Sequence, residues 1–170
     1  MNTTLETPHI DAELAMTQDE HASLRLWLRL LSCTATIERH VRERLRVRFD
    51  TTLPRFDMMA QLNREPRGLK MTELSRRLMV TGGNVTGLAR ELVAEGLVER
   101  HTGAADRRVQ VVRLTARGRR SFETMAALHE RWVVERLAGL DRRERATLYA
   151  ALGRLKDALV STAPDDEEGP

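Results

Sequence analysis

The sequence predicts a mainly helical protein that carries one small β-hairpin. Apolar residues recur every three or four positions through most of the chain, which is the period of an α-helix. After Gly96 the period changes to two over a short stretch, as in a strand with one buried face. With 170 residues, 41% of them hydrophobic, the chain is long enough to bury one sizeable core.

The first predicted helix, residues 19–48, is long and contains neither proline nor glycine. It carries two apolar stripes. One stripe consists of Leu24, Trp27, Leu28, Leu31 and Ala35, and the other of Leu30, Ile37, Val41 and Leu45. Two apolar stripes on one helix indicate two packing partners.

Four shorter elements are expected next. Pro54 suits a first helical turn, so it opens a helix in PRFDMMAQLN, which the turn-rich REPRG ends. LKM is a minimal strand, and Thr72 is expected to cap the helix ELSRRLMV, with Leu74 facing inward. A further helix begins near Thr81 and ends before Gly96, where glycine commonly follows a helix.

The predicted hairpin has two strands, LVERH and RRVQVVRL, joined by the turn TGAAD. Val109, Val111 and Leu114 suggest that the second of these is a paired strand. Thr115 then caps another helix. In DRRE, residues 141–144, the acids have the spacing of a capping box, which opens a last helix with leucine every three or four residues.

Several functional classes find no support in the residues. One cysteine excludes an internal disulfide framework, and C-x-x-C and H-E-x-x-H are missing, so no metal site and no cofactor are expected. The five histidines are scattered and no nucleophile or phosphate-loop motif accompanies them, so no catalytic residue and no enzyme is expected. No stretch approaches about 18 apolar residues and the first twenty contain acids, which predicts a cytoplasmic protein without a membrane partner.

The net charge of +3 conceals an uneven distribution. Residues 70–120 contain eleven Lys and Arg against five acids, a net charge of +6, whereas residues 121–170 have a net charge of −3. A basic stretch with neutral or acidic flanks is what binding to a phosphate backbone requires. It is equally typical of a solvated surface.

The stretch TGGNVTGLARELVAEG contains apolar residues at helical spacing, yet glycines open it and one lies inside. Each interior glycine costs about 1 kcal/mol relative to alanine. Helix, turn, helix and basic hairpin is the order of a winged helix-turn-helix, whose second helix enters the DNA major groove. Small residues let the backbone of such a helix approach the phosphates. An ordinary surface helix after a flexible loop is the alternative.

The predicted DNA contacts of this helix are Thr81, Gly82, Asn84, Thr86, Gly87 and Arg90. Asparagine can pair with adenine and arginine with guanine, and threonine can contact a phosphate or the methyl group of thymine. The fold class expected is therefore mainly α with a small β-hairpin wing.

The segment LVERHTGAADRRVQVVRLTARG, with its D-x-R followed by L-T-x-x-G, resembles the MarR family of bacterial transcriptional regulators over residues 19–160. The resemblance implies a homodimer in which the N- and C-terminal helices intertwine. It implies that Arg108 in the wing enters the minor groove and that Asp106 supports the wing by pairing with arginine. Arg107 is a further charge at the wing tip, suited to a phosphate.

The resemblance also implies a domain organisation. It comprises a flexible N-terminal extension (1–18), dimerisation helices (19–50 and 116–160), a winged helix-turn-helix DNA-binding lobe (51–115) and a disordered acidic tail (161–170).

TTLPRFDMMAQL and LSRRLMVTGGNVTGLARELVAEGLVER resemble the branch of the family that controls the catabolism of aromatic acids. This implies a repressor that a small aromatic acid or an aryl-CoA thioester releases from an inverted-repeat operator in double-stranded DNA. A pocket is predicted where the long first helix meets the second helix and the lobe. Its candidate lining residues are Trp27, His40, Arg44, Phe56, Met58 and Met59. Such residues are also typical of a core or a solvated surface.

A thiol-based redox sensor of the same fold is the alternative, with Cys33 on the first helix. Peroxide sensors of the family place their reactive cysteine earlier, at the position of Leu28, and support it with tyrosines, whereas Tyr149 lies on the last helix. LLSCTATI surrounds Cys33 with small and apolar residues, as around an inert packing cysteine. A sequence-neutral architectural protein would instead bind genomic DNA as well as any operator.

Overall fold

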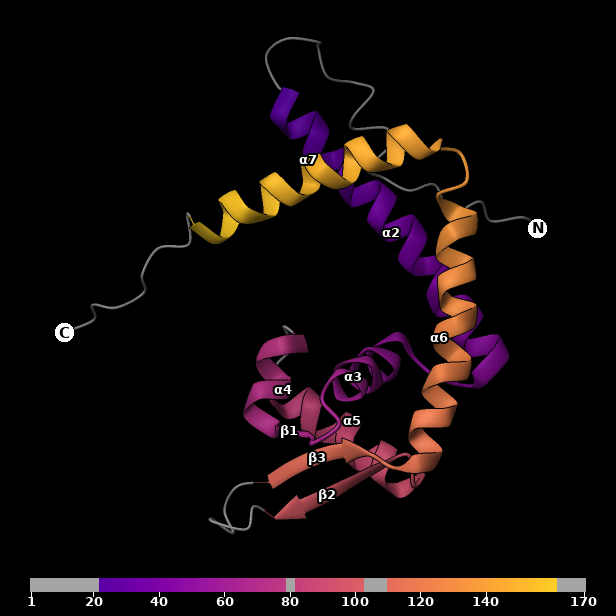
Figure 1. Ribbon diagram of the computed structural model, residues 1–170, viewed down its shortest axis with the longest axis vertical. Coiled ribbons are helices and arrows are strands. Elements are labelled where there is room, and N and C mark those ends of the chain that lie inside the picture. Colours follow the sequence, from indigo (N-terminus) through magenta and orange to yellow (C-terminus); the bar gives the residue numbers. More distant parts are fainter. Residues whose placement is uncertain (1–21, 79–81, 103–109, 162–170) are drawn as a thin grey trace, which may run out of the picture. The chain divides into compact units, whose positions relative to one another are not determined.

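The computed structural model describes residues 22–78, 82–102 and 110–161. They form α2 (Ala22–Phe49), α3 (Leu53–Arg64), β1 (Leu69–Lys70), α4 (Met71–Leu78), α5 (Gly82–Ala94), β2 (Val98–Thr102), β3 (Gln110–Leu114), α6 (Ala116–Arg136) and α7 (Arg142–Ser161) (Figure 1). The predicted mainly helical fold with a small β-hairpin is confirmed. The chain falls into two compact units, Met1–Trp132 and Val133–Pro170.

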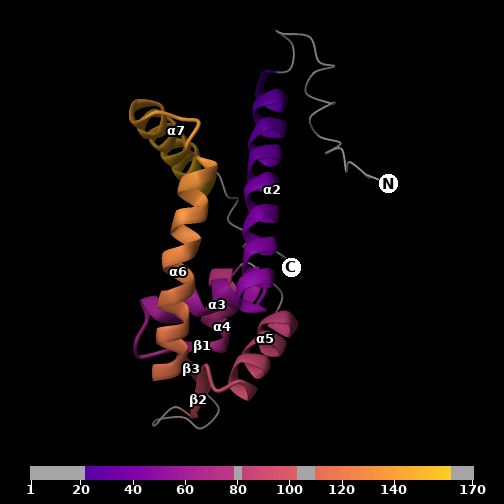
Figure 2. The ribbon, with the colours of Figure 1, turned by 90° about the vertical axis from the view of Figure 1, so that its right-hand side faces the viewer.

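The strands form one antiparallel sheet in the order β1-β3-β2. Val98 of β2 pairs with Leu114 of β3, and Leu69 of β1 pairs with Val112 on the other edge of β3. The two-stranded hairpin expected from the sequence is therefore extended by the short strand LK. In Figures 1 and 2 the helices α3, α4 and α5 gather beside this sheet.

The core of the first unit lies between these helices, the sheet and the facing sides of α2 and α6. Its fully buried side chains come from every layer. They include Leu45, Met58, Leu62, Leu74, Val85, Leu92 and Val112. Burial of both Val85 and Leu92 fixes which face of α5 points inward.

The end of α5 and the start of α6 are joined by backbone contacts. Gly96 has φ +68°, and the N–H groups of Gly96 and Leu97 donate to Val93 and Leu92, which closes α5 with a Schellman motif. The Thr115 hydroxyl donates to the Gly96 carbonyl (2.8 Å) and accepts the Gly118 N–H (2.9 Å), so its predicted capping role is confirmed. The threonine thus caps α6 and holds the end of α5.

Gly118 explains the last position of the L-T-x-x-G pattern. A Cβ at Gly118 would lie 1.9 Å from the backbone oxygen of Leu97, so only glycine allows α6 to pass this close. The same carbonyl accepts the Thr115 N–H at 3.1 Å. The pattern therefore describes a tight crossing of two backbone segments.

The second unit contains the end of α6, a corner and α7. The Asp141 N–H donates to Glu144 (2.7 Å) and the Glu144 N–H donates to Asp141 (2.8 Å), which confirms the predicted capping box. Arg145 donates to the Leu140 carbonyl and reinforces the corner. None of the described side chains of α7 is buried. Its apolar stripe, Leu148, Leu152, Leu155 and Leu159, is exposed.

One local expectation was wrong. Helix α4 begins at Met71, directly after β1, so Thr72 lies inside the first turn and is not the residue before the helix. The paired strand predicted at β3 is confirmed, since Val111 pairs with His101 and Leu114 with Val98 of β2. Val112 and Leu114 are buried, whereas Val111 lies on the opposite face and is half-buried. Val109 lies outside the described residues.

No helix in the described part of the chain is long and apolar enough to cross a membrane.

Candidate nucleic-acid interface

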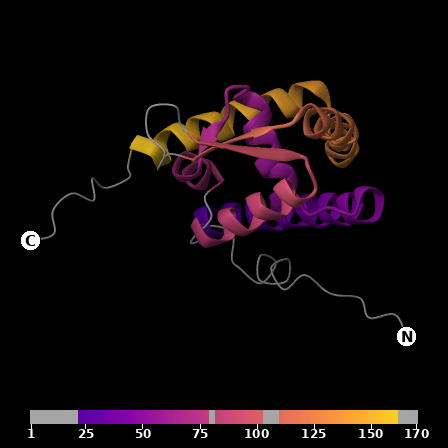
Figure 3. The same ribbon diagram turned by 90° about the horizontal axis from the view of Figure 1, so that it is seen from below.

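Helix α5 presents two different faces. Val85, Ala89 and Leu92 are fully buried against the core. Asn84, Thr86 and Arg90, three of the predicted contact residues, are exposed. This helix adjoins β2, and Figure 3 shows it as a neighbour of the β2–β3 hairpin. Its polar residues and the hairpin are therefore available to the same partner.

Gly87 lies on the outer side of α5, two residues from buried Val85. A Cβ built at Gly87 has no heavy atom within 4 Å. Packing inside the chain therefore does not require glycine here, although glycine weakens the helix by about 1 kcal/mol. No packing contact within the described residues accounts for the glycine at this position.

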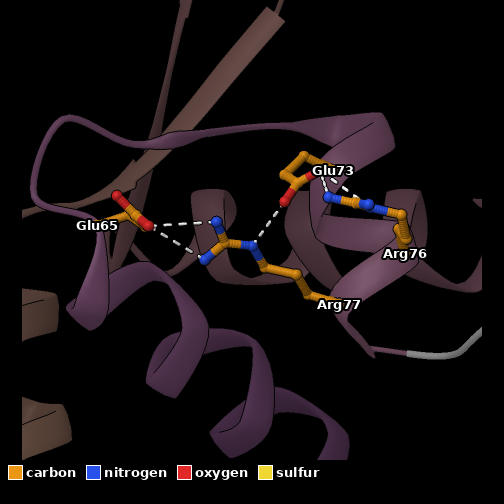
Figure 4. A network of polar contacts seen from close by, with 4 residues as sticks. All are labelled: Glu65, Glu73, Arg76 and Arg77. Atoms are coloured by element: carbon orange, nitrogen blue, oxygen red, sulfur yellow. Dashed lines mark hydrogen bonds and ion pairs between the residues drawn. The ribbon is translucent and has the colours of Figure 1, made fainter. Parts of the chain in front are cut away.

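A network of charged side chains holds α4, which precedes α5, against the end of α3. Figure 4 shows Arg77 between Glu65 and Glu73. Its Nε donates to Glu73 (2.8 Å) and both terminal nitrogens donate to Glu65 (3.2 Å each), while Arg76 donates to the other oxygen of Glu73 (2.7 Å). Bonds from Arg77 and then Arg76 lower the pKa of Glu73, so its carboxylate stays charged. The network links the two helices that carry α5.

A second network lies on the hairpin. Glu99 and Arg113 face each other across β2 and β3, and Arg113 Nε donates to Glu99 (2.6 Å). His101 approaches the same carboxylate at 3.1 Å. Hydrogen bonds from His101 and then Arg113 lower the pKa of Glu99.

These pairs engage Glu65, Glu73 and Glu99, while several basic residues of the lobe form no such pair. Arg90 on α5, Arg100 on β2 and Lys70 on β1 are exposed and form no ion pair with any described residue. The surface of the lobe therefore has an excess of positive charge available to a polyanion.

The remaining predicted DNA contacts lie at the start of α5 or outside the described residues. Thr81 and the wing residues Asp106, Arg107 and Arg108 lie outside the described residues, and Gly82 opens α5. Their roles stay predictions, as do those of Asn84, Thr86, Gly87 and Arg90.

The predicted effector residues lie in different surroundings. Phe56, Met58 and Met59 of α3 are buried in the core, where Phe56 packs on Phe122 with ring centroids 5.4 Å apart. Trp27 and Arg44 are exposed on α2, and His40 is half-buried. Trp27 and Arg44 are roughly 25 Å apart along the helix. Their ligand roles stay predictions.

Cys33 is exposed on α2. The sequence suggested a packing cysteine, but nothing in the described chain covers it.

A cavity of about 80 Å³ lies where the end of α2, α3, the end of α5 and α6 meet. Its lining includes Asp50, Thr51, Arg55, Glu95 and Ser121. Arg55 forms an ion pair with Glu95 at the end of α5. Sequence reasoning missed this pair because its members are 40 residues apart and neither belongs to a motif.

Within the described ranges, no three His, Cys, Asp or Glu side chains lie close enough together to hold a metal ion.

Comparison with known proteins shows what the lobe resembles. Residues 49–109, which contain α3, β1, α4, α5 and β2, match the MarR family. This segment is therefore similar to the MarR family. It includes Asn84, Gly87 and Arg90 and the network around Arg77.

Two relatives resemble this chain over about half of its length. An uncharacterized HTH-type transcriptional regulator, YdgJ of Bacillus subtilis (strain 168), is 29% identical over 91 residues, which are 54% of this chain and 56% of the relative. The chain thus spans little more than half of that relative.

Solved structures extend the likeness beyond the matched segment. A MarR family transcriptional regulator from Silicibacter pomeroyi has a TM-score of 0.72 and 29% identity, covering 85% of this chain and 99% of that one. The MepR-DNA complex of S. aureus has a TM-score of 0.66 and 22% identity, covering 78% and 96%, and shows that the fold is shared.

Proposed function

We propose that this chain is a homodimeric, sequence-specific DNA-binding transcriptional regulator that reads an inverted-repeat operator with α5. One observation carries the proposal. The outer face of α5 combines exposed Asn84 and Arg90 with a glycine that internal packing does not require. Asparagine and arginine supply base-pairing donors, and the bare backbone at Gly87 allows close approach to the groove.

The distribution of charge supports the same proposal of DNA binding. Lys70, Arg90 and Arg100 are exposed and have no acidic partner among the described residues. In this proposal they contact phosphates, which position the lobe, while base contacts specify the sequence. The wing residues Arg107 and Arg108 add phosphate and minor-groove contacts.

The dimer is proposed from the exposed stripe of α7. Leu148, Leu152, Leu155 and Leu159 have helical spacing and none is buried in the described chain. A leucine stripe of this kind gains stability when a second copy covers it, at roughly 25 cal/mol per Å² of apolar surface. Two lobes would then meet half-sites about one helical turn apart.

Sedimentation and selection of genomic fragments test the proposal. We expect a dimer that enriches an inverted repeat, with affinity falling about a thousandfold or more between 50 and 200 mM salt. Leu152→Asp should produce monomers, whereas Ala150→Asp, on the opposite side of α7, should leave the dimer intact. A monomeric wild type, or equal binding to operator and bulk genomic DNA, contradicts the proposal.

We propose further that a small aromatic acid or aryl-CoA thioester releases the operator, so that the protein acts as a repressor. The support is the resemblance to regulators of aromatic acid catabolism and the exposure of Trp27 and Arg44, which can stack on a ring and pair with an anion. A hundredfold loss of operator affinity requires about 2.7 kcal/mol of coupling.

Calorimetry with benzoyl and hydroxycinnamoyl compounds, each with and without CoA, tests this step together with operator release. Binding that weakens in Arg44→Ala and releases DNA supports it. Absence of binding across the panel, with release by peroxide that disappears in Cys33→Ser, would favour the redox sensor instead.

A further inference from the structure

The corner that follows α5 is held from two sides. Arg55 of α3 pairs with the Glu95 carboxylate, and Arg117 of α6 donates to the Glu95 carbonyl at 3.1 Å. Thr115 binds the next residue, Gly96. Because Glu95 directly follows the last residue of α5, these contacts fix the position of the helix end.

Arg55 is incompletely satisfied in this arrangement. Its side chain is only 14% exposed, and its Nε is buried without a hydrogen-bond acceptor among the described residues. Glu95 engages a terminal nitrogen of Arg55. A carboxylate that approaches the guanidinium from the side of Nε can accept from Nε and a terminal nitrogen together, which is the stronger, bidentate geometry.

Glu95 can leave Arg55 at little cost, because its side chain is 45% exposed and can return to water. An incoming carboxylate that replaces Glu95 keeps the charge around Arg55 unchanged. It therefore avoids adding a further negative charge next to Asp50, which also lines the cavity.

The cavity beside Arg55 limits the size of such a ligand. Its volume is about 80 Å³, roughly half of the 150 Å³ cavity that accepts benzene. The enclosed space is therefore smaller than an aromatic ring requires. Its wall combines the hydroxyl residues Thr51 and Ser121 with the apolar Met59 and Met125, which suits a short carbon chain with one polar end.

We propose that this cavity binds a carboxylate of two or three carbons, which displaces Glu95 from Arg55 and loosens the end of α5. The site itself is independent of DNA. Its regulatory consequence is a lower affinity for DNA once the end of α5 is no longer held by Arg55. This consequence rests on the proposed function.

Binding is tested on the intact protein with propionate as the probe and propionamide as the uncharged control of similar shape. Two-dimensional NMR follows the side-chain Nε–H of Arg55 and the amide of Gly96. We expect both signals to shift with propionate at millimolar concentration and to stay unchanged with propionamide. Equal responses to the two compounds, or no response to propionate, overturn the site.

Three variants of the site and one control variant separate competition by Glu95 from a general loss of structure. Glu95→Gln removes the competing charge, so propionate should bind about tenfold more tightly. Arg55→Met should abolish propionate binding. Arg55→Lys keeps the charge but lacks the planar guanidinium that can donate two parallel hydrogen bonds, so it should weaken propionate binding severalfold. Glu38→Gln, which breaks the comparable exposed pair with Arg42 on α2, should change nothing.

The Glu95→Gln variant tests the proposal even if Arg55→Met fails to fold. Weaker or unchanged propionate binding in Glu95→Gln would overturn the proposed displacement of Glu95 from Arg55.

The effect of propionate on operator binding is measured separately. Saturating propionate should lower operator affinity about three- to tenfold in the wild type and much less in Glu95→Gln, where the link is already broken. Propionate binding without any change in operator affinity would overturn the regulatory step and leave the site. A protein that binds no operator would refute the proposed function and leave the NMR test of the cavity unaffected.

Discussion

Replacing Gly87 with alanine separates the stability of α5 from its proposed contact with DNA. The added methyl group meets no heavy atom of the chain within 4 Å, so no clash is expected in the free protein. Alanine also removes the helix-propensity cost of glycine. The free energy of unfolding should therefore rise by about 0.5–1 kcal/mol.

Operator binding should change in the opposite direction. The methyl group projects from the outer face of α5, opposite the buried Val85 and Ala89, where the groove would approach. If the backbone lies against DNA there, an extra methyl forces a displacement that costs about 1–3 kcal/mol, as in an overpacked interface. This corresponds to a loss of about five- to a hundredfold in affinity.

Urea denaturation followed by circular dichroism measures stability, and fluorescence anisotropy with a labelled operator measures affinity. Gly153→Ala on α7 is the matched control, because a Cβ there also meets no atom within 4 Å. It should stabilise the protein without weakening DNA binding. Full operator affinity in both Gly87→Ala and Gly87→Leu would refute the assignment of this face to the groove.

Two further predictions concern stability. Gly118→Ala should lower the free energy of unfolding by about 2–5 kcal/mol. The reason is that the new Cβ would lie 1.9 Å from the Leu97 oxygen and displace the Thr115 hydrogen bonds. A gain in stability in urea denaturation would contradict this. His129 packs on Phe56 with ring centroids 4.8 Å apart, and burial lowers its pKa below the ordinary value of about 6.5. The unfolded chain then binds the proton more readily, so stability should be complete above pH 6.5, fall as pH drops below it, and level off below the folded-state pKa. His129→Gln should reduce this fall, and an unchanged pH profile would speak against the burial effect.

Features that depend on neighbouring residues were predictable from the sequence. The capping box of Asp141 and Glu144, and Gly96 after α5, each follow from local hydrogen bonds and backbone conformation. The division of α5 into a buried and an exposed face follows from its period of 3.6 residues. These rules need no knowledge of the tertiary structure.

Features that depend on distant segments were not predictable. The pairing of β1 with β3 joins residues more than forty positions apart, and the Arg55–Glu95 pair likewise has no local signal. Phe56 and Met58 were candidate pocket residues, yet helical spacing of apolar residues is the same for a pocket wall and a core. Gly118 was recognised as part of a pattern, but its cause is the approach of Leu97 from another element.

The central claim is that the outer face of α5 reads the bases. Competition binding of Asn84→Ala and Arg90→Ala to the selected operator and to random DNA tests it most directly, with Arg131→Ala on α6 as an exposed control. Each α5 variant should lose about 1–3 kcal/mol on the operator and clearly less on random DNA, while the control keeps wild-type affinity for both. Equal losses on both DNAs, or operator affinity unchanged in both α5 variants, would contradict the claim.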